Sequence, residues 1–116
     1  LFLPIQKAAI AALTGPLDGV KEQCKLYQAR RDALCGGLRS IGWNVPDSQG
    51  TMFVWAPIPK GFASSEEVVM ELMEKSGVIC VPGSSFGSLG EGYVRLALEE
   101  LRKAVQSIAD SGILNR

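Results

Sequence analysis

VICVPGSSFGSLGEGYVRLAL, residues 78–98, is the stretch that decides the fold of this chain. It opens with a continuously apolar segment (78–81), crosses a loop of glycine and serine (82–92) and ends in an alternating segment (93–98). These patterns predict two strands with no helix between them. Strands that follow one another in this way favour an antiparallel sheet.

The segments before this stretch predict helices. Apolar residues recur at helical spacing over 17–41, which predicts a long amphipathic helix with one buried stripe, and a shorter helix is predicted over 6–13. Ser64 and Glu67 form a Ser-x-x-Glu capping box, so a third helix begins there, and Gly77 ends it. Each of these signals is local and independent of the sheet.

Two further strands and a last helix complete the pattern. A short strand is predicted over 43–45, and a strand over 51–56 is apolar on both faces, which predicts a central position in a sheet covered on both sides. Leu101, Val105 and Ile108 mark a C-terminal helix. We therefore predict one α+β domain over 1–116, with a mostly antiparallel sheet of three to four strands packed against helices in two layers.

Composition excludes several functions. Twelve Lys and Arg residues balance twelve Asp and Glu residues, so the chain lacks the positive field of a nucleic-acid binder. No run of eighteen apolar residues exists to span a membrane. The sequence has no histidine, which excludes Ser-His-Asp and Cys-His catalysis and imidazole metal sites within this chain. We expect no nucleic-acid partner, no membrane partner and no metal.

The cysteines and the first residue bear on the cell compartment and on chain length. Cys24, Cys35 and Cys80 are odd in number and lack C-x-x-C spacing, which argues against a disulfide framework and against zinc. We expect buried thiols in a reducing compartment, and hence a cytoplasmic location. The chain begins at Leu1 without a signal-peptide pattern, so we expect Leu1 to be an internal residue of a longer protein.

Arg95 is the residue that does not fit a core. Alternation places it on the face opposite Val94 and Leu96, in the middle of a strand. Burying a guanidinium without an anion is costly, and its fork matches a carboxylate through two parallel hydrogen bonds. Arg95 is therefore our candidate for binding the carboxylate of a small substrate. The alternatives are that this face is merely solvent-exposed, or that Arg95 pairs with Glu99 or another acid.

The loop over 82–92 resembles a phosphate loop in composition only. It has neither G-x-x-x-x-G-K-[ST] nor G-x-G-x-x-G between a strand and a helix. We expect it to shape the rim of a site beside Arg95. Paired acids such as Glu66 and Glu67 fall on helix starts and exposed helix faces, where negative charge favours the helix dipole. No residue of this chain is predicted to be catalytic.

Five segments together resemble one protein family: PIQKAA (4–9), YQARRD (27–32), GTMFVW (50–55), VPGSSFG (81–87) and GEGYVRLAL (90–98). In this order and spacing they resemble the C-terminal small domain of class I/II aminotransferases, the fold type I enzymes that use pyridoxal 5′-phosphate (PLP). The resemblance implies transfer of an amino group between an amino acid and a 2-oxo acid. It implies that Arg95 binds the substrate α-carboxylate and that the small domain closes the site.

The resemblance also implies what this chain lacks. The family's Schiff-base lysine and its other PLP-binding residues lie before the point where this chain begins. No lysine here stands in the family's lysine motif; the six are Lys7, Lys21, Lys25, Lys60, Lys75 and Lys103. We expect PLP, a large domain of the same chain and a homodimer in the intact enzyme. The polypeptide alone is expected to bind no PLP and to be inactive.

Two other functions stay open at this point. The chain could be the small domain of another fold type I PLP enzyme, such as a decarboxylase, a lyase or a carbon–carbon bond-forming synthase. It could also be a binding module without catalytic activity. Within the aminotransferases, the segments 27–32 and 53–57 look closest to bacterial enzymes acting on alanine, diaminopimelate or similar amino acids.

Overall fold

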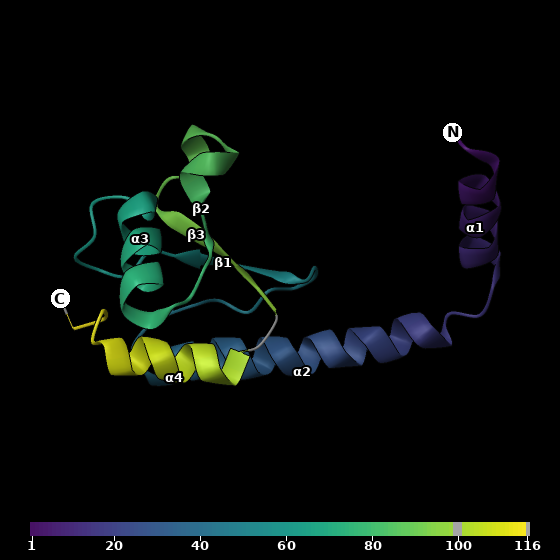
Figure 1. The fold of residues 1–116 in the computed structure, drawn as a ribbon. Coiled ribbons are helices and arrows are strands. Elements are labelled where there is room, and N and C mark those ends of the chain that lie inside the picture. Colours follow the sequence, from purple (N-terminus) through teal and green to yellow (C-terminus); the bar gives the residue numbers. More distant parts are fainter. Residues whose placement is uncertain (99–100, 116) are drawn as a thin grey trace.

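The computed structural model describes residues 1–98 and 101–115. The described residues form a three-stranded antiparallel sheet of order β1-β3-β2, packed against helices (Figure 1). The α+β prediction is confirmed. Along the chain the elements are α1 (Leu3–Thr14), α2 (Asp18–Ser40), β1 (Phe53–Pro57), α3 (Ser65–Ser76), β2 (Val81–Pro82), the 3-10 turns Gly83–Phe86 and Ser88–Gly90, β3 (Tyr93–Ala97) and α4 (Leu101–Ser111).

One face of the sheet is buried and the other is not. Val54 on β1, and Val94 and Leu96 on β3, are at most 5% exposed. They join apolar residues of the helices in a single core that includes Leu34, Leu38, Val68, Leu72 and Ile108. Period-two alternation then places the remaining side chains of β1 and β3 on the opposite face, where the candidate site lies.

Helix α3 is built as its sequence predicts. The Ser64 side chain accepts a hydrogen bond from the Glu67 backbone N–H at 3.2 Å, and the Glu67 carboxylate accepts one from the Ala63 N–H at 2.9 Å. Gly77 ends the helix in the left-handed conformation, with φ of 68°. These hydrogen bonds fix the N-terminus of α3 in place, and a loop is attached to it.

The prediction that 51–56 forms a central strand is wrong. Strand β3 lies in the centre of the sheet and β1 lies at one edge. Trp55 on β1 remains 38% exposed, so no second layer of the described residues covers that face of the strand. The second apolar face of β1 carries Phe53 and Trp55, which belong to a groove rather than to a core.

The strand predicted over 43–45 does not form, although Trp43 and Val45 are buried. Side-chain hydrogen bonds, not a neighbouring strand, hold this extended segment. Arg39 Nη1 donates to the Val45 carbonyl at 2.8 Å, and Trp43 itself donates through Nε1 to the Pro57 carbonyl at 2.8 Å. The buried residues of this segment are apolar, and that apolar character predicts a strand.

The strand predicted over 78–81 is reduced to Val81–Pro82. The Val78 N–H is used at the end of α3, where it donates to the Leu72 carbonyl at 3.3 Å. Val81 pairs with Arg95 and Pro82 pairs with Val94. Pro82 has no N–H to continue the ladder, so the pairing stops there.

Only the second half of α2 has the buried stripe that its periodicity predicts. Leu34, Cys35 and Leu38 are buried, whereas Leu17 and Val20 are more than half exposed. Figure 1 shows α4 and the sheet beside the C-terminal half of α2, while the N-terminal half extends away from them. Periodicity reports which face of a helix is apolar, but it does not report what covers that face.

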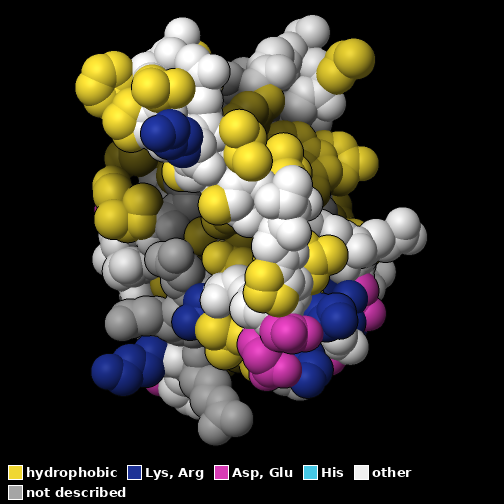
Figure 2. Space-filling model, turned by 90° about the vertical axis from the view of Figure 1, so that its right-hand side faces the viewer, with side chains coloured by type: hydrophobic (Ala, Val, Ile, Leu, Met, Phe, Trp, Pro, Cys, Tyr) yellow, Lys and Arg dark blue, Asp and Glu magenta, His cyan; other side chains and the backbone are white. Residues whose placement is uncertain are grey.

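Helix α1 has no buried residue, and its apolar side chains are exposed: Leu3, Ile5, Ile10 and Leu13. Figure 2 shows hydrophobic side chains gathered over much of the face that carries α1, with most of the charged side chains toward the bottom of the view. Among the described residues, no helix is both long enough and apolar enough to cross a membrane.

The prediction of three buried cysteines is wrong for one of them. Cys24 lies on the uncovered half of α2 and is exposed, whereas Cys35 and Cys80 are buried. Burial raises the pKa of the Cys80 thiol to about 11, because the apolar surroundings disfavour the thiolate. All three cysteines are free.

Candidate functional site

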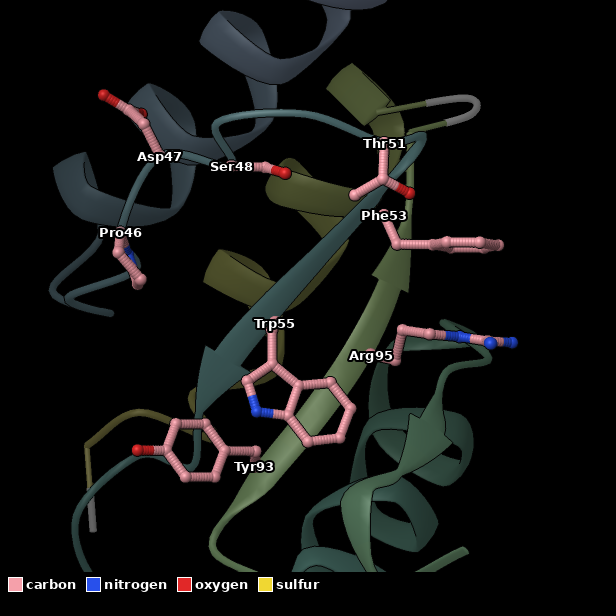
Figure 3. Close-up of a pocket in the computed structure, with 8 residues that line it drawn as sticks. All are labelled: Pro46, Asp47, Ser48, Thr51, Phe53, Trp55, Tyr93 and Arg95. Carbon is pink, nitrogen blue, oxygen red and sulfur yellow. The ribbon is translucent and has the colours of Figure 1, made fainter. Parts of the chain in front are cut away.

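A groove of about 460 Å³ lies on the non-core face of the sheet. Figure 3 shows its lining, which comes from β1, from β3 and from the segment that leads into β1: Pro46, Asp47, Ser48, Thr51, Phe53, Trp55, Tyr93 and Arg95. Alternation predicts that Arg95 lies on this face, and the structure confirms that placement; Tyr93 lies on the same face.

Arg95 stands in the middle of the sheet, paired with Trp55 on β1 and with Val81 on β2. Its side chain is partly buried rather than merely solvent-exposed. The guanidinium carbon lies 4.2 Å from the centroid of the Phe53 ring and 4.9 Å from that of Phe86. Figure 3 shows the Arg95 and Phe53 side chains running in the same direction from neighbouring strands. Both rings attract the cation through their π-electrons.

Arg95 has no ion-pair partner within the described part of the chain. The acids that form ion pairs there do so with other cations; Asp47, for example, lies 2.9 Å from Arg39 Nη1. Glu99, the alternative partner suggested by the sequence, lies outside the described residues. Partial burial removes water from the Arg95 guanidinium, and the aromatic rings offset only part of that desolvation cost. The guanidinium is therefore expected to bind the anionic group of a ligand strongly.

Aromatic side chains form a cluster beside Arg95. Trp55 stacks on Tyr93 with ring centroids 5.6 Å apart, and it meets Phe86 edge-on at 5.7 Å. Sequence reasoning did not identify Phe53, Trp55 or Phe86 as site residues. The pairing of Trp55 with Arg95 could have revealed the β1 residues, but Phe86 comes from a loop that has no periodic pattern.

The loop between β2 and β3 brings Phe86 to Arg95. The loop contains two 3-10 turns, Gly83–Phe86 and Ser88–Gly90, whose backbones cross closely at Gly83 and Gly90. An added Cβ at Gly83 would overlap the Gly90 carbonyl, and one at Gly90 would overlap the Gly83 carbonyl. Only hydrogen atoms fit between these backbones. The loop thus contacts the arginine through one ring, as expected for the rim of a site.

Glu91 attaches the end of this loop to α3. Its carboxylate accepts hydrogen bonds from the Ser65 N–H at 2.7 Å, from the Gly92 N–H at 2.9 Å and from the Ser65 hydroxyl at 3.2 Å. The two backbone bonds and the hydroxyl bond hold the pKa of the Glu91 carboxyl below its ordinary value, because each of them favours the ionised form.

This lowered pKa predicts how stability depends on pH. A carboxyl whose folded-state pKa lies below its unfolded value contributes stability above the ordinary value of 4.5, and that contribution is lost as pH falls through the lowered folded value. Urea unfolding of the wild-type chain and of Glu91→Gln should therefore differ most near neutral pH and converge on acidification. A difference in free energy of unfolding that stays constant from neutral to strongly acidic pH would contradict the ionised carboxylate.

The groove alone does not fit PLP. Covalent attachment of PLP requires a lysine amine, and no lysine lines the groove. Lys21, Lys25 and Lys75 form ion pairs with acids on their own helices. Within the described residues, no group of three or more Cys, Asp or Glu side chains is arranged to hold a metal ion. The chemistry open to these residues is the binding of an acid, so no step through PLP is assigned to them.

Comparison with known proteins agrees with this geometry. The family described as aminotransferase class I and II matches residues 3–108. The LL-diaminopimelate aminotransferase of Halothermothrix orenii is 42% identical over 97% of this chain and 30% of its own length. The same enzyme of Moorella thermoacetica is 42% identical over 92% of this chain and 28% of its own length. The chain thus spans less than a third of the length of these relatives.

Solved structures show the same fold. An alanine aminotransferase from Pyrococcus furiosus superimposes with a TM-score of 0.84 and 32% identity, over 92% of this chain and 29% of the other. An aromatic aminotransferase from Pyrococcus horikoshii gives a TM-score of 0.84 and 29% identity, over 93% and 31%. The match over residues 3–108, together with these relatives, confirms the resemblance: this chain belongs to the class I and II aminotransferase family.

Proposed function

We propose that this chain is the small domain of a PLP-dependent aminotransferase and supplies the cation that binds the α-carboxylate of an amino acid or 2-oxo acid. The observation that carries the proposal is Arg95, a partly buried cation in an open aromatic groove with no acid partner among the described residues. Its fork can hold a carboxylate through two parallel hydrogen bonds. A carboxylate held in this way fixes the rest of the substrate relative to the reacting groups.

The aromatic residues strengthen this binding. Phe53 and Phe86 present ring surface to the guanidinium, and Trp55 packs against Phe86. Surfaces that exclude water increase the strength of an ion pair. PLP, in an aminotransferase, supplies the electron sink for the chemistry at the substrate Cα. The role of this chain is to bind and orient the amino acid or 2-oxo acid.

We infer that the partner of this chain is a large domain of the same polypeptide, and that the chain is inactive without it. The relatives are about three times longer, and the exposed apolar residues of α1 and of the first half of α2 offer a surface for such a domain. Leu17, which precedes α2, and Val20 in its first turn are both more than half exposed. A homodimer and a cytoplasmic location remain predictions from the sequence.

LL-diaminopimelate is the first amino donor to test, because the named relatives act on it. Amino transfer from this donor to 2-oxoglutarate would be assayed with the complete enzyme, meaning this chain together with its large domain. The proposal of aminotransferase function fails if the complete enzyme releases carbon dioxide, or cleaves or joins carbon–carbon bonds, instead of producing a new amino acid.

Arg95→Ala in the complete enzyme should raise the KM for 2-oxoglutarate and lower kcat/KM about 100-fold, because removing one partner of a hydrogen-bonded charge pair costs ~3 kcal/mol. Arg95→Lys should retain part of the binding, since it keeps the charge but loses the planar fork. Steady-state kinetics and a binding titration with the 2-oxo acid measure both effects.

Lys60→Ala is the matched control, because it also removes one positive charge but from an exposed turn after β1. It should leave KM unchanged. An Arg95→Ala enzyme that binds 2-oxoglutarate as tightly as the wild type would remove Arg95 from the site.

A further inference from the structure

We propose that Glu91 is a positioning residue, which fastens the 83–92 loop to the N-terminus of α3 and so places the Phe86 ring against Arg95. The inference rests on the proposed function, because Arg95 is the residue through which Glu91 would act. It extends the site to a residue whose side chain points away from the groove, toward α3.

The attachment joins parts of the chain that are far apart in sequence. Glu91 accepts from both the backbone N–H and the hydroxyl of Ser65, which lies 26 residues earlier and is fully buried. Hydrogen bonds to a charged acceptor are stronger than bonds between neutral groups. Because both carboxylate oxygens are used in this way, Glu91 is occupied by α3 and does not neutralise Arg95.

The start of the loop is fastened at the same point. The Ser84 N–H donates to the Ser65 hydroxyl oxygen at 3.4 Å, and the two hydroxyl oxygens lie 3.3 Å apart. Ser65 thus contacts the loop on both sides of Phe86, through Ser84 before it and Glu91 after it. The close crossing at Gly83 and Gly90 leaves little slack between these two attachments.

Phe86 depends on this attachment because the core does not hold it. Its side chain is 53% exposed, and Leu89 farther along the loop is 97% exposed. Even so, the Phe86 ring lies 4.9 Å from the Arg95 guanidinium carbon and meets Trp55 edge-on. A half-exposed ring keeps one position only if its backbone is fixed, and the bonds of Ser65 and Glu91 fix that backbone.

The test uses the complete enzyme with 2-oxoglutarate as the probe. Glu91→Gln replaces one acceptor oxygen with an NH2 group that cannot accept a hydrogen bond. We expect 2-oxoglutarate to bind about 10-fold more weakly, a loss of the size of one hydrogen bond. Glu66→Gln is the matched control, because Glu66 is an exposed acid in the first turn of the same helix. It removes the same charge from the helix N-terminus and should change nothing.

A double-mutant cycle with Arg95→Ala separates a role through Arg95 from a general loss of structure. If Glu91 acts through Arg95, adding Glu91→Gln to Arg95→Ala weakens binding no further. Additive effects, or a silent Glu91→Gln beside a damaging Arg95→Ala, would overturn the inference and leave the proposed function intact. A silent Arg95→Ala would overturn the proposed function itself.

A second measurement needs neither ligand nor activity. In the ligand-free enzyme labelled with ¹³C-arginine, the Arg95 side-chain protons should show ring-current shifts from Phe53 and Phe86, assigned with Arg95→Lys. Glu91→Gln should move these signals toward ordinary arginine values, and Glu66→Gln should not. If Glu91→Gln fails to fold, Ser65→Ala, which removes the hydroxyl bonds but keeps the backbone bond, should shift them in the same direction. Unchanged signals in the folded variants would refute the positioning role.

Discussion

The substitution Gly83→Ala is expected to lower the free energy of unfolding by about 4 kcal/mol, which is more than most single substitutions cost. The added methyl group would overlap the Gly90 carbonyl and lie 2.6 Å from the Tyr93 carbonyl oxygen. Both obstacles are backbone atoms, which cannot rotate away as a side chain can. Relief requires the two 3-10 turns to separate, and Phe86 lies at the end of the first turn.

Urea unfolding followed by circular dichroism measures this loss for the 116-residue chain. Gly50→Ala is the control, because a Cβ at Gly50 meets nothing within 4 Å and the position is an exposed loop. Its unfolding midpoint should stay close to that of the wild type. A Gly83→Ala chain as stable as Gly50→Ala would show that the two turns do not cross at this distance.

Trp43→Ala is expected to cost about 4 kcal/mol, within the range for deleting a large buried aromatic side chain. Trp43 is only 2% exposed, and its indole N–H donates to the Pro57 carbonyl at the end of β1. The substitution leaves a cavity and removes the partner of that carbonyl. Because Pro57 belongs to the strand that carries Phe53 and Trp55, the groove should loosen as well.

Trp43→Phe is the smaller change at the same position. It keeps a six-membered aromatic ring and loses the five-membered ring with its N–H, so its cost should be about 2–3 kcal/mol, from one unpaired acceptor and a smaller cavity. The same unfolding experiment gives both numbers. Equal costs for Trp43→Phe and Trp43→Ala would mean that packing contributes little, which is incompatible with a fully enclosed side chain.

The features that sequence predicts correctly here are those with a local cause. The Ser64 cap and the Gly77 terminus of α3 follow from hydrogen-bonding groups and backbone conformations available within a few residues. The placement of Arg95 follows from period-two alternation within a single strand. In each case the residues that make the pattern are also the residues that make the structure.

The features that sequence predicts incorrectly depend on distant contacts. The apolar character of β1 gives no information about which strand lies beside it, so the sequence predicts a central strand where the structure has an edge strand with an aromatic outer face. Trp43 likewise contacts the end of β1, through its hydrogen bond to the Pro57 carbonyl. Phe86 reaches Arg95 only because Ser65 and Glu91 meet across 26 residues. No window of neighbouring residues contains that information.

The unequal coverage of α2 has a mechanical consequence. The helix has 23 residues and is therefore about 35 Å long, with its C-terminal half embedded in the core and its N-terminal half outside it. A tilt of about 10° about the embedded end displaces the opposite end of such a rod by ~6 Å. Conversely, a domain that binds the region of Leu17 and Val20 sets the angle of α2 and of the sheet packed against its other half. That angle determines the direction from which an acid can approach Arg95.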